Sequence, residues 1–269
     1  MSGETLLHLA LQVLETAEPR AKAAAARAAA GAWTGGSVPL GGPVEAPDRP
    51  ARPEKPACVA PGKVPRRRLN TLAGRCALMH AIAHIEFNAI DLAFDMVVRF
   101  AHDSTLDDAR RTEFVTDWIG VGDDEARHFE MVADRLEAMG SHYGALPAHD
   151  GLWDSAQATA GALDARLAVA PMVLEARGLD VTPGMIERLT SAGDRESAGI
   201  LRIIYEEELG HVAAGARWFR HLCEKSGHEP ASHFQTLVTK YFRGRLKPPF
   251  NTDARMRADL PADFYGPLV

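Results

Sequence analysis

The sequence predicts an all-α protein built around a four-helix bundle with a crossover connection. Hydrophobic residues make up 46% of the 269-residue chain and aromatic residues only 7%, and alanine is abundant. Few stretches show the alternation of Val, Ile and Thr that a half-buried strand requires. Apolar residues instead recur at helical spacing through four long stretches, with further segments at both ends of the chain.

The first expected element is a helix over residues 3–32, with a break near Pro19. Leucines repeat in its first half, and its second half is an alanine-rich run that we interpret as plain helix. Proline removes a backbone donor, which explains the break. From residue 34 to 68 the composition changes to Gly, Pro and isolated charges, so this stretch is predicted to be an extended arm or linker.

The first pair of long helices is expected at about 69–102 and 105–139. Ser104 or Thr105, followed by two aspartates, provides an N-terminal cap for the second of these helices. Gly140 is expected to end it. Both helices carry apolar residues along one face, as helices of a bundle core do.

The second pair follows a loop. Its first helix is expected at 155–177, with Pro171 as a kink and Gly178 as its end. Thr182–Pro183 is expected to start a short connecting helix. The last long helix covers about 194–226.

Composition therefore predicts three parts of the chain. Residues 1–68 form an N-terminal helix and a Pro/Gly-rich arm, residues 69–227 form the bundle, and residues 228–269 form a helix near 231–243 and a tail. A helical solenoid is the structural alternative, but no repeat of fixed length supports it.

Charge and cysteine content exclude several classes of function. The net charge of -6 gives no general attraction to nucleic acid or anionic membrane. Two basic clusters, one at Arg66–Arg68 and a second between residues 240 and 247, leave tRNA as an open alternative. Three widely spaced cysteines fit neither a disulfide framework nor a thiolate zinc site, and no apolar run of about 20 residues is present. We expect a cytoplasmic protein outside the membrane. The second basic cluster comprises Lys240, Arg243, Arg245 and Lys247.

Two Glu-x-x-His motifs occupy helix faces that are otherwise apolar. Glu125 and His128 lie three residues apart in the expected second helix, and Glu208 and His211 repeat this spacing in the fourth. Three residues advance an α-helix by about 4.5 Å, close to one turn, so each pair can bind one metal ion. A buried carboxylate and imidazole are difficult to explain as structural groups.

The first and third helices each add one inward carboxylate, Glu86 and Glu175. Four carboxylates in one core would repel each other, and each would cost several kcal/mol to bury without a partner. Divalent cations remove this cost. Oxygen and nitrogen donors suit iron or manganese, so we expect two iron ions, with Mn/Fe or Mn/Mn pairs as alternatives. The alternative is that these six residues bind no metal and are ordinary polar residues, either exposed or in salt bridges.

Histidines 80 and 84 have the spacing of a zinc pair but are not expected to bind the metals. In a helix His84 lies about 200° and His80 about 120° around the axis from Glu86. We interpret each as a histidine that either packs in the core or contacts the ligand residues without binding the metals.

Other polar residues near the motifs have weaker interpretations. Tyr205 is a candidate phenol near the metals, with a buried structural tyrosine as the alternative. Glu206 and Glu207 are expected to point away from the ligand face. Arg177 and Asp180 are expected in a loop, where they would cap helix ends.

The order Glu, Glu-x-x-His, Glu, Glu-x-x-His over four helices is the ligand set of ferritin-like di-iron proteins. Between residues 69 and 226 the chain resembles a bacterial branch of that superfamily. It is also distantly similar, in the metal motif alone, to the tRNA-modifying hydroxylase that acts on isopentenyl adenosine. The resemblance implies a di-iron bundle that activates dioxygen. The resemblance rests on the sequence segments HAIAHIEFNAIDLAFD, DDEARHFEMVADRLEAMG, APMVLEARGLDVTP and IIYEEELGHVAAGARWF.

Three functions are compatible with this reading. The first is an oxidoreductase that uses dioxygen and an electron donor to hydroxylate or desaturate a substrate. The second is a ferroxidase that handles or stores iron, and the third is a metal-binding bundle without turnover. The long terminal segments favour the first, because they suit a covered site in a monomer or small homo-oligomer better than a closed shell.

Overall fold

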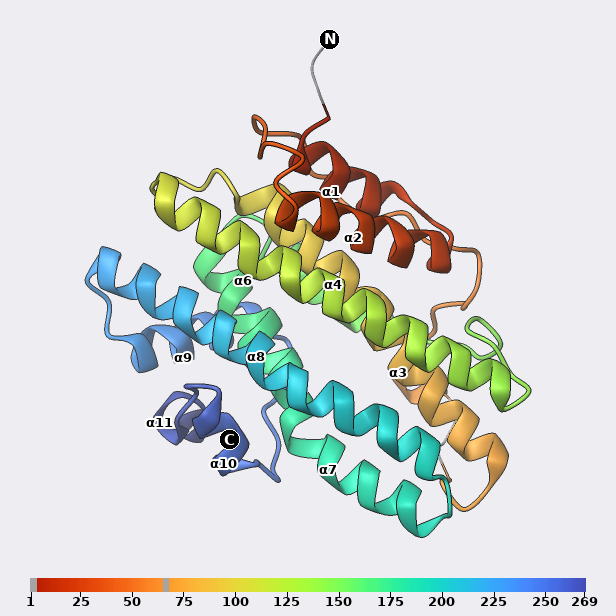
Figure 1. Ribbon diagram of the computed structural model, residues 1–269. Helices are drawn as coiled ribbons and strands as arrows, with labels where there is room; N and C mark the ends of the chain where they lie inside the picture. The colour runs from red at the N-terminus through yellow and green to blue at the C-terminus, as the bar shows by residue number, and fades with distance from the viewer. Residues whose placement is uncertain (1–3, 65–67) are drawn as a thin grey trace. The chain divides into compact units, whose positions relative to one another are not determined.

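The computed structural model describes residues 4–64 and 68–269, and within these residues it is helical without a strand (Figure 1). An isolated β-bridge between Cys58 and Ala148 is present. The predicted all-α class is confirmed. The elements in order are α1 (Leu6–Glu15), α2 (Pro19–Thr34), η1 (Pro61–Lys63), α3 (Leu72–Phe100), α4 (Asp108–Ala138), α5 (Gly151–Ala158), α6 (Leu163–Val169), η2 (Ala170–Glu175), α7 (Ala176–Ser191), α8 (Arg195–Ser226), α9 (Pro230–Tyr241), α10 (Thr252–Arg257), α11 (Ala262–Tyr265) and η3 (Gly266–Leu268).

The chain divides into two compact units, the N-terminal unit Met1–Trp153 and the C-terminal unit Asp154–Val269. The boundary falls inside α5. The division into 1–68, 69–227 and 228–269 stays a prediction. Across the described chain, no helix combines the length and the apolar character that crossing a membrane requires.

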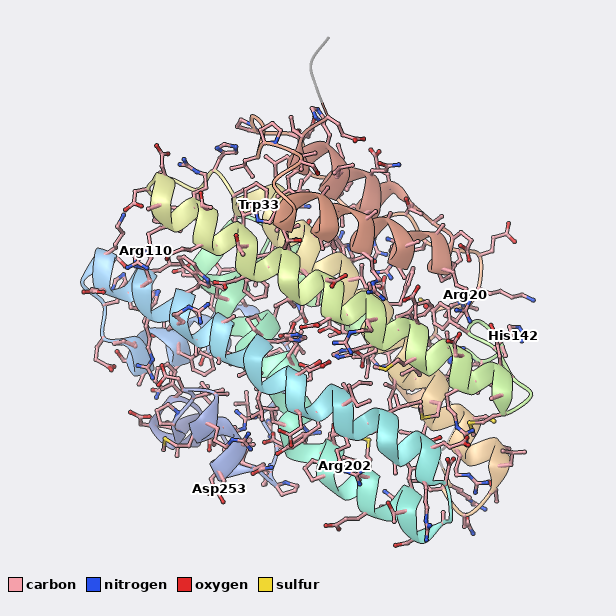
Figure 2. All side chains as sticks on the ribbon, in the orientation of Figure 1. Arg20, Trp33, Arg110, His142, Arg202 and Asp253 are labelled. Carbon is pink, nitrogen blue, oxygen red and sulfur yellow. The ribbon has the colours of Figure 1, made fainter. Side chains whose placement is uncertain are left out.

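In the N-terminal unit, α3 and α4 pack together along their length, α1 covers α3, and α2 lies against α4 (Figure 1). Arg20 and Trp33, labelled in Figure 2, lie near the two ends of α2. Arg20 forms ion pairs with Asp134 (2.8 Å) and Glu137 (2.7 Å) of α4. The indole of Trp33 donates a hydrogen bond to Thr116 Oγ1 at 3.0 Å. These contacts fix α2 along the outer face of α4.

The N-terminal cap of α4 is Asp107, so the prediction of Ser104 or Thr105 was wrong by two or three residues. The Asp107 side chain accepts a hydrogen bond from the backbone N–H of Arg110 at 3.0 Å. Thr105 is engaged instead in a turn, where its N–H donates to Asp103 Oδ1 at 2.9 Å. Gly140 ends the helix as predicted, because its φ of +77° suits glycine.

Of the arm predicted at residues 34–68, residues 35–60 are extended as predicted, the short helix η1 follows them, and residues 65–67 lie outside the described chain. The extended residues 35–60, called the arm below, are hydrogen-bonded to the N-terminal unit. The N–H of Leu6 donates to the carbonyl of Pro39 at 2.9 Å, and the N–H of Ala51 donates to that of Leu14 at 2.7 Å. These bonds lie at opposite ends of α1. The arm is therefore hydrogen-bonded to α1 near both ends of this helix.

A buried ion-pair cluster fastens α2 and the arm to α3. Lys22, in the alanine-rich run, is fully buried and pairs with the fully buried Asp91. Arg52 of the arm places Nη1 3.1 Å from Asp91 Oδ2 and donates from Nη2 to Asn88 Oδ1 at 2.7 Å. The alanine-rich run is thus more than plain helix, because it carries a buried cation for α3.

The C-terminal unit is arranged around the pair α7 and α8 (Figure 1). α6 and η2 pack on α8, α9 packs on α6, and α10 contacts α7 and α8. The single helix predicted at 155–177 is instead divided among α5, α6, η2 and the start of α7. Arg166 of α6 connects the two sides of the break between α5 and α6. Its guanidinium donates to Thr159 Oγ1 at 3.0 Å and to the carbonyl of Ala156 at 2.7 Å.

Helix α7 continues through Gly178 and Pro183, so the predictions of a helix end and a new start there were wrong. Proline at position 183 removes the donor that would normally bond to the carbonyl of Leu179. That carbonyl accepts a hydrogen bond from the Asn251 side chain instead, at 3.2 Å. The tail therefore satisfies the group that the proline leaves without its helical partner.

The tail contains two short helices and is held by residues of α7 that were expected in a loop. Arg255 donates to both carboxylate oxygens of the buried Asp180, at 2.8 Å each. Arg177 donates to the carbonyls of Lys247 (2.7 Å) and Pro249 (3.1 Å). The predicted basic cluster of the tail is exposed, while Arg66 and Arg67 of the other cluster lie outside the described residues.

Candidate metal centre

Three of the predicted ligands converge inside the N-terminal unit. Glu86 comes from α3, and Glu125 and His128 come from successive turns of α4. Nδ1 of His128 lies 3.4 Å from an Oε2 atom of each carboxylate. One ligand atom from each of the three lies within 4.8 Å of the others, and all three side chains are buried. This group can hold a metal ion.

Burial makes the electrostatics of this group unusual. The pKa of Glu86 is raised well above its ordinary value, first by burial and then by the charge of Glu125. Burial lowers the pKa of His128, but its interactions with Glu125 and Glu86 outweigh burial and raise this pKa to about 11. Both shifts retain protons among the three side chains. The site thus favours extra positive charge, which a proton or a cation can supply.

The donor set fits a divalent transition metal. Apart from its approach to His128, the buried Oε2 atom of Glu86 has no hydrogen-bond partner among the described residues. Leaving a buried carboxylate oxygen in this condition is costly. A cation bound between two carboxylates and an imidazole would compensate it, and this combination of oxygen and nitrogen suits iron or manganese.

The other three predicted ligands lie in the C-terminal unit. Glu208 and His211 occupy one face of α8, with Nδ1 of His211 3.7 Å from Glu208 Oε2. Glu175 is the last residue of η2, a π-helical segment that packs on α8. The Glu208 side chain keeps 12% of its surface exposed, whereas that of His211 keeps 4%. Each unit therefore carries one Glu-x-x-His motif and one further glutamate on a neighbouring element.

His80 and His84 are buried and hold the loop after α4, in agreement with the interpretation that they are core histidines. Nε2 of His80 accepts the backbone N–H of Gly144 at 3.0 Å. His84 donates from Nε2 to the carbonyl of His149 at 3.1 Å, so its Nδ1 accepts the Tyr143 hydroxyl at 2.9 Å. Burial lowers the pKa of both histidines to about 4, which keeps them neutral.

Tyr143 was not singled out from the sequence. Its ring packs against Phe87 (5.5 Å between centroids) and Phe129 (5.3 Å), the residues that directly follow Glu86 and His128. Tyr143 lies in an irregular loop, where no periodicity marks a buried side chain. Only its position after the end of a long helix offered a signal.

Tyr205 is partly buried, and its hydroxyl accepts a hydrogen bond from the Asn251 side chain at 3.1 Å. Asn251 is the N-terminal cap of α10, so this contact links α8 to the tail. Glu206 is exposed and lies 3.6 Å from Arg257. A place for Tyr205 near bound metals stays a prediction.

Residues 15–266 match the family model described as "Protein of unknown function (DUF455)". The chain belongs to this family. A relative from Haemophilus influenzae (strain ATCC 51907 / DSM 11121 / KW20 / Rd), described as "Uncharacterized protein", is 44% identical over 208 residues. The aligned region covers 77% of this chain and 72% of the relative. No solved structure matches the chain. Function in this DUF455 member must therefore be argued from its buried glutamate and histidine side chains.

Proposed function

We propose that this protein is a di-iron carboxylate oxidoreductase of the ferritin-like type, which activates dioxygen to hydroxylate or desaturate a substrate. The supporting observation is the buried group of Glu86, Glu125 and His128, whose donors and electrostatics suit a metal ion. The same pattern of side chains on η2 and α8 of the C-terminal unit supports a second ion. Two iron ions, once bound, would supply the electrons and Lewis acidity for reduction of dioxygen.

The proposal gives each Glu-x-x-His motif one metal ion. His128 and His211 would provide one nitrogen donor each, and Glu125 and Glu208 would provide carboxylates able to bridge. Glu86 and Glu175 would be terminal or bridging ligands. The four carrying segments, α3, α4, η2 with α7, and α8, would be the helices of a ferritin-like bundle.

The residues around the N-terminal group already perform part of the required work. Glu86, Glu125 and His128 are buried, which excludes bulk water from them, and the next residues in sequence, Phe87 and Phe129, are also fully buried with ring centroids 5.6 Å apart. Exclusion of water strengthens the interactions between ligand carboxylates and a cation. Because His128 and Glu86 retain protons without metal, binding of a divalent ion would release protons from them.

Iron storage is the alternative, and the outer faces of the N-terminal unit disfavour it. α1 covers α3, α2 covers α4, and the arm is bonded along α1. A closed shell uses the outer faces of its bundles as contacts between subunits. The proposal therefore includes a monomer or small homo-oligomer, with dioxygen, an electron donor and an organic substrate as partners.

Metal analysis combined with a ferrous titration tests the proposal. Protein reconstituted anaerobically with ferrous iron should retain about two ions per chain. Exposure to air should then oxidise about this amount and stop, and light scattering should show a small particle.

Three outcomes would contradict the proposal in different ways. Metal content near zero after reconstitution would reject a metal centre. A large shell that accumulates ferric mineral would favour storage. Tight retention of zinc without reaction with dioxygen would favour a bundle without turnover.

A further inference from the structure

The segment that carries Glu175 departs from α-helical geometry. Residues Ala170–Glu175 form the π-helical segment η2 between α6 and α7. Pro171 lies at its start, and a proline inside a regular helix lacks a donor and clashes with the preceding turn. A wider π turn accommodates the ring, and such turns occur often at functional sites. The turn also changes the direction in which Glu175 leaves the helix.

Pro171 packs directly on Gly215 of α8. A Cβ atom placed on Gly215 would lie 2.5 Å from both Cβ and Cγ of Pro171 and 3.7 Å from Cγ of Met172. Glycine is disfavoured within helices, so its presence here has a reason in packing. Gly199 and Gly210 of the same helix have open space where a Cβ would be, so the close approach is particular to Gly215.

This contact sets the register between η2 and α8. The two elements belong to an antiparallel hairpin, in which α7 and α8 are joined by a short turn (Figure 1). Glu175 lies four residues after Pro171, and His211 lies four residues before Gly215. Four residues advance α8 by about 6 Å, and the wider π turn of η2 advances by somewhat less over the same number of residues. Glu175 and His211 therefore lie at nearly the same level, on the side where the two elements touch.

We infer that Gly215 is a positioning residue, which lets Pro171 seat η2 on α8 and so brings Glu175 level with His211 for metal binding. The inference rests on the proposed function, because it assumes that both side chains are ligands. It adds a residue outside the ligand set. An alanine at position 215 would push Pro171 outward, and Glu175 would move with it.

The test compares Gly215→Ala with Gly210→Ala, which adds the same methyl group to the same helix in open space. Both proteins and the unaltered chain are reconstituted anaerobically with ferrous iron and then dialysed, and iron per chain is measured. We expect about two ions for the unaltered chain and for Gly210→Ala. For Gly215→Ala we expect about one ion, with the affinity for the second reduced about tenfold or more.

Circular dichroism and thermal unfolding separate positioning from a general defect in folding. Selective loss of one ion from a folded Gly215→Ala protein supports positioning, whereas loss of both ions together with helix content indicates a structural role and overturns the inference. If Gly215→Ala does not fold, Pro171→Gly decides, because it removes the contact without adding bulk. Retention of two ions at unchanged affinity in the folded variant overturns the inference.

Failure of the proposed function would look different. An unaltered chain that binds no iron rejects the metal centre itself, and the positioning role with it. An unaltered chain that binds two ions, beside a Gly215→Ala protein that binds both as tightly, rejects only the role of Gly215.

Discussion

The two units carry the same Glu-x-x-His motif in different surroundings. In the N-terminal unit the motif and Glu86 lie on regular helices, are buried, and place His128 Nδ1 3.4 Å from both carboxylates. In the C-terminal unit the corresponding nitrogen and oxygen of His211 and Glu208 are 3.7 Å apart, Glu208 is partly exposed, and the second glutamate, Glu175, ends a π turn. A motif of fixed spacing therefore gives one compact and one looser group of donors.

Each unit also has a glycine that allows a close approach beside its motif, with a different neighbour. A Cβ on Gly122 would lie 2.5 Å from the ring of Phe94, whereas one on Gly215 would meet Pro171 at the same distance. An aromatic ring can tilt away, but a proline held in the backbone cannot. The C-terminal group should thus depend more on its glycine for geometry, and the N-terminal group more for stability.

The largest expected effect comes from the two histidines that are predicted ligands. His128→Ala and His211→Ala should each weaken metal binding by more than about 100-fold, the upper end of what loss of an outer partner costs. We expect the greater loss for His128, because it contacts two buried carboxylates. Equilibrium dialysis against ferrous iron under nitrogen measures both affinities.

His84→Ala is the matched control for these variants. His84 is buried and lies two residues before Glu86, but its imidazole is hydrogen-bonded to the loop after α4. It should lose stability and keep its metal affinity within about threefold of the unaltered chain. Equal loss of metal from His84→Ala and His211→Ala would show that the ligand faces are wrongly assigned.

A smaller effect is expected at Gly122. Gly122→Ala should destabilise the protein by about 1–3 kcal/mol, because the new methyl group overpacks against Phe94. Gly120→Ala, two residues away with open space around its Cβ, should instead be neutral or stabilising by up to about 1 kcal/mol. Urea unfolding of the metal-free proteins measures both changes. A Gly122→Ala protein as stable as Gly120→Ala would contradict the close packing of α3 and α4.

The N-terminal group should also give the metal-free protein a gradual dependence of stability on pH. The pKa values of His128 and Glu86 are raised on folding, so the folded protein holds more protons than the unfolded chain above pH 6.5. The contribution of these two groups to stability is then greatest at low pH, and that of His128 is lost as pH rises from 6.5 toward about 11, by up to about 1.4 kcal/mol per pH unit.

Urea unfolding of metal-free protein at pH 6.5, 7.5 and 8.5 measures this slope. The metal-loaded protein should lose the dependence, because the cation replaces the protons. His128→Ala should reduce the slope without metal. A metal-free protein whose stability increases over this range would show that the carboxylates do not retain protons on His128.

The sequence predicted α3, α4 and α8 well because their apolar faces are long and their ends carry ordinary signals, such as Asp194 before α8 and Gly227 after it. It also identified the three candidate ligands that converge in the N-terminal unit. Their spacing along two helices is a local property, so periodicity was enough to find them.

The errors arose where residues far apart in sequence decide the local structure. Pro183 reads as a helix start, but Asn251 supplies the donor that lets α7 continue through it. Lys22 reads as one polar residue in an alanine-rich helix, and only Asp91 and Arg52 make it part of the core. Pro171, at the start of the π turn, likewise packs on Gly215, a residue distant from it in sequence.

The ion pair of Lys22 with Asp91 also bears on folding autonomy. Asp91 lies in the middle of α3, and both cations that face it, Lys22 and Arg52, belong to the first 68 residues. A shortened chain that began at α3 would lose both cations and would expose Asp91 together with the face of α3 that α1 and α2 cover. We therefore expect the long helices to be less stable without the N-terminal helices and the arm.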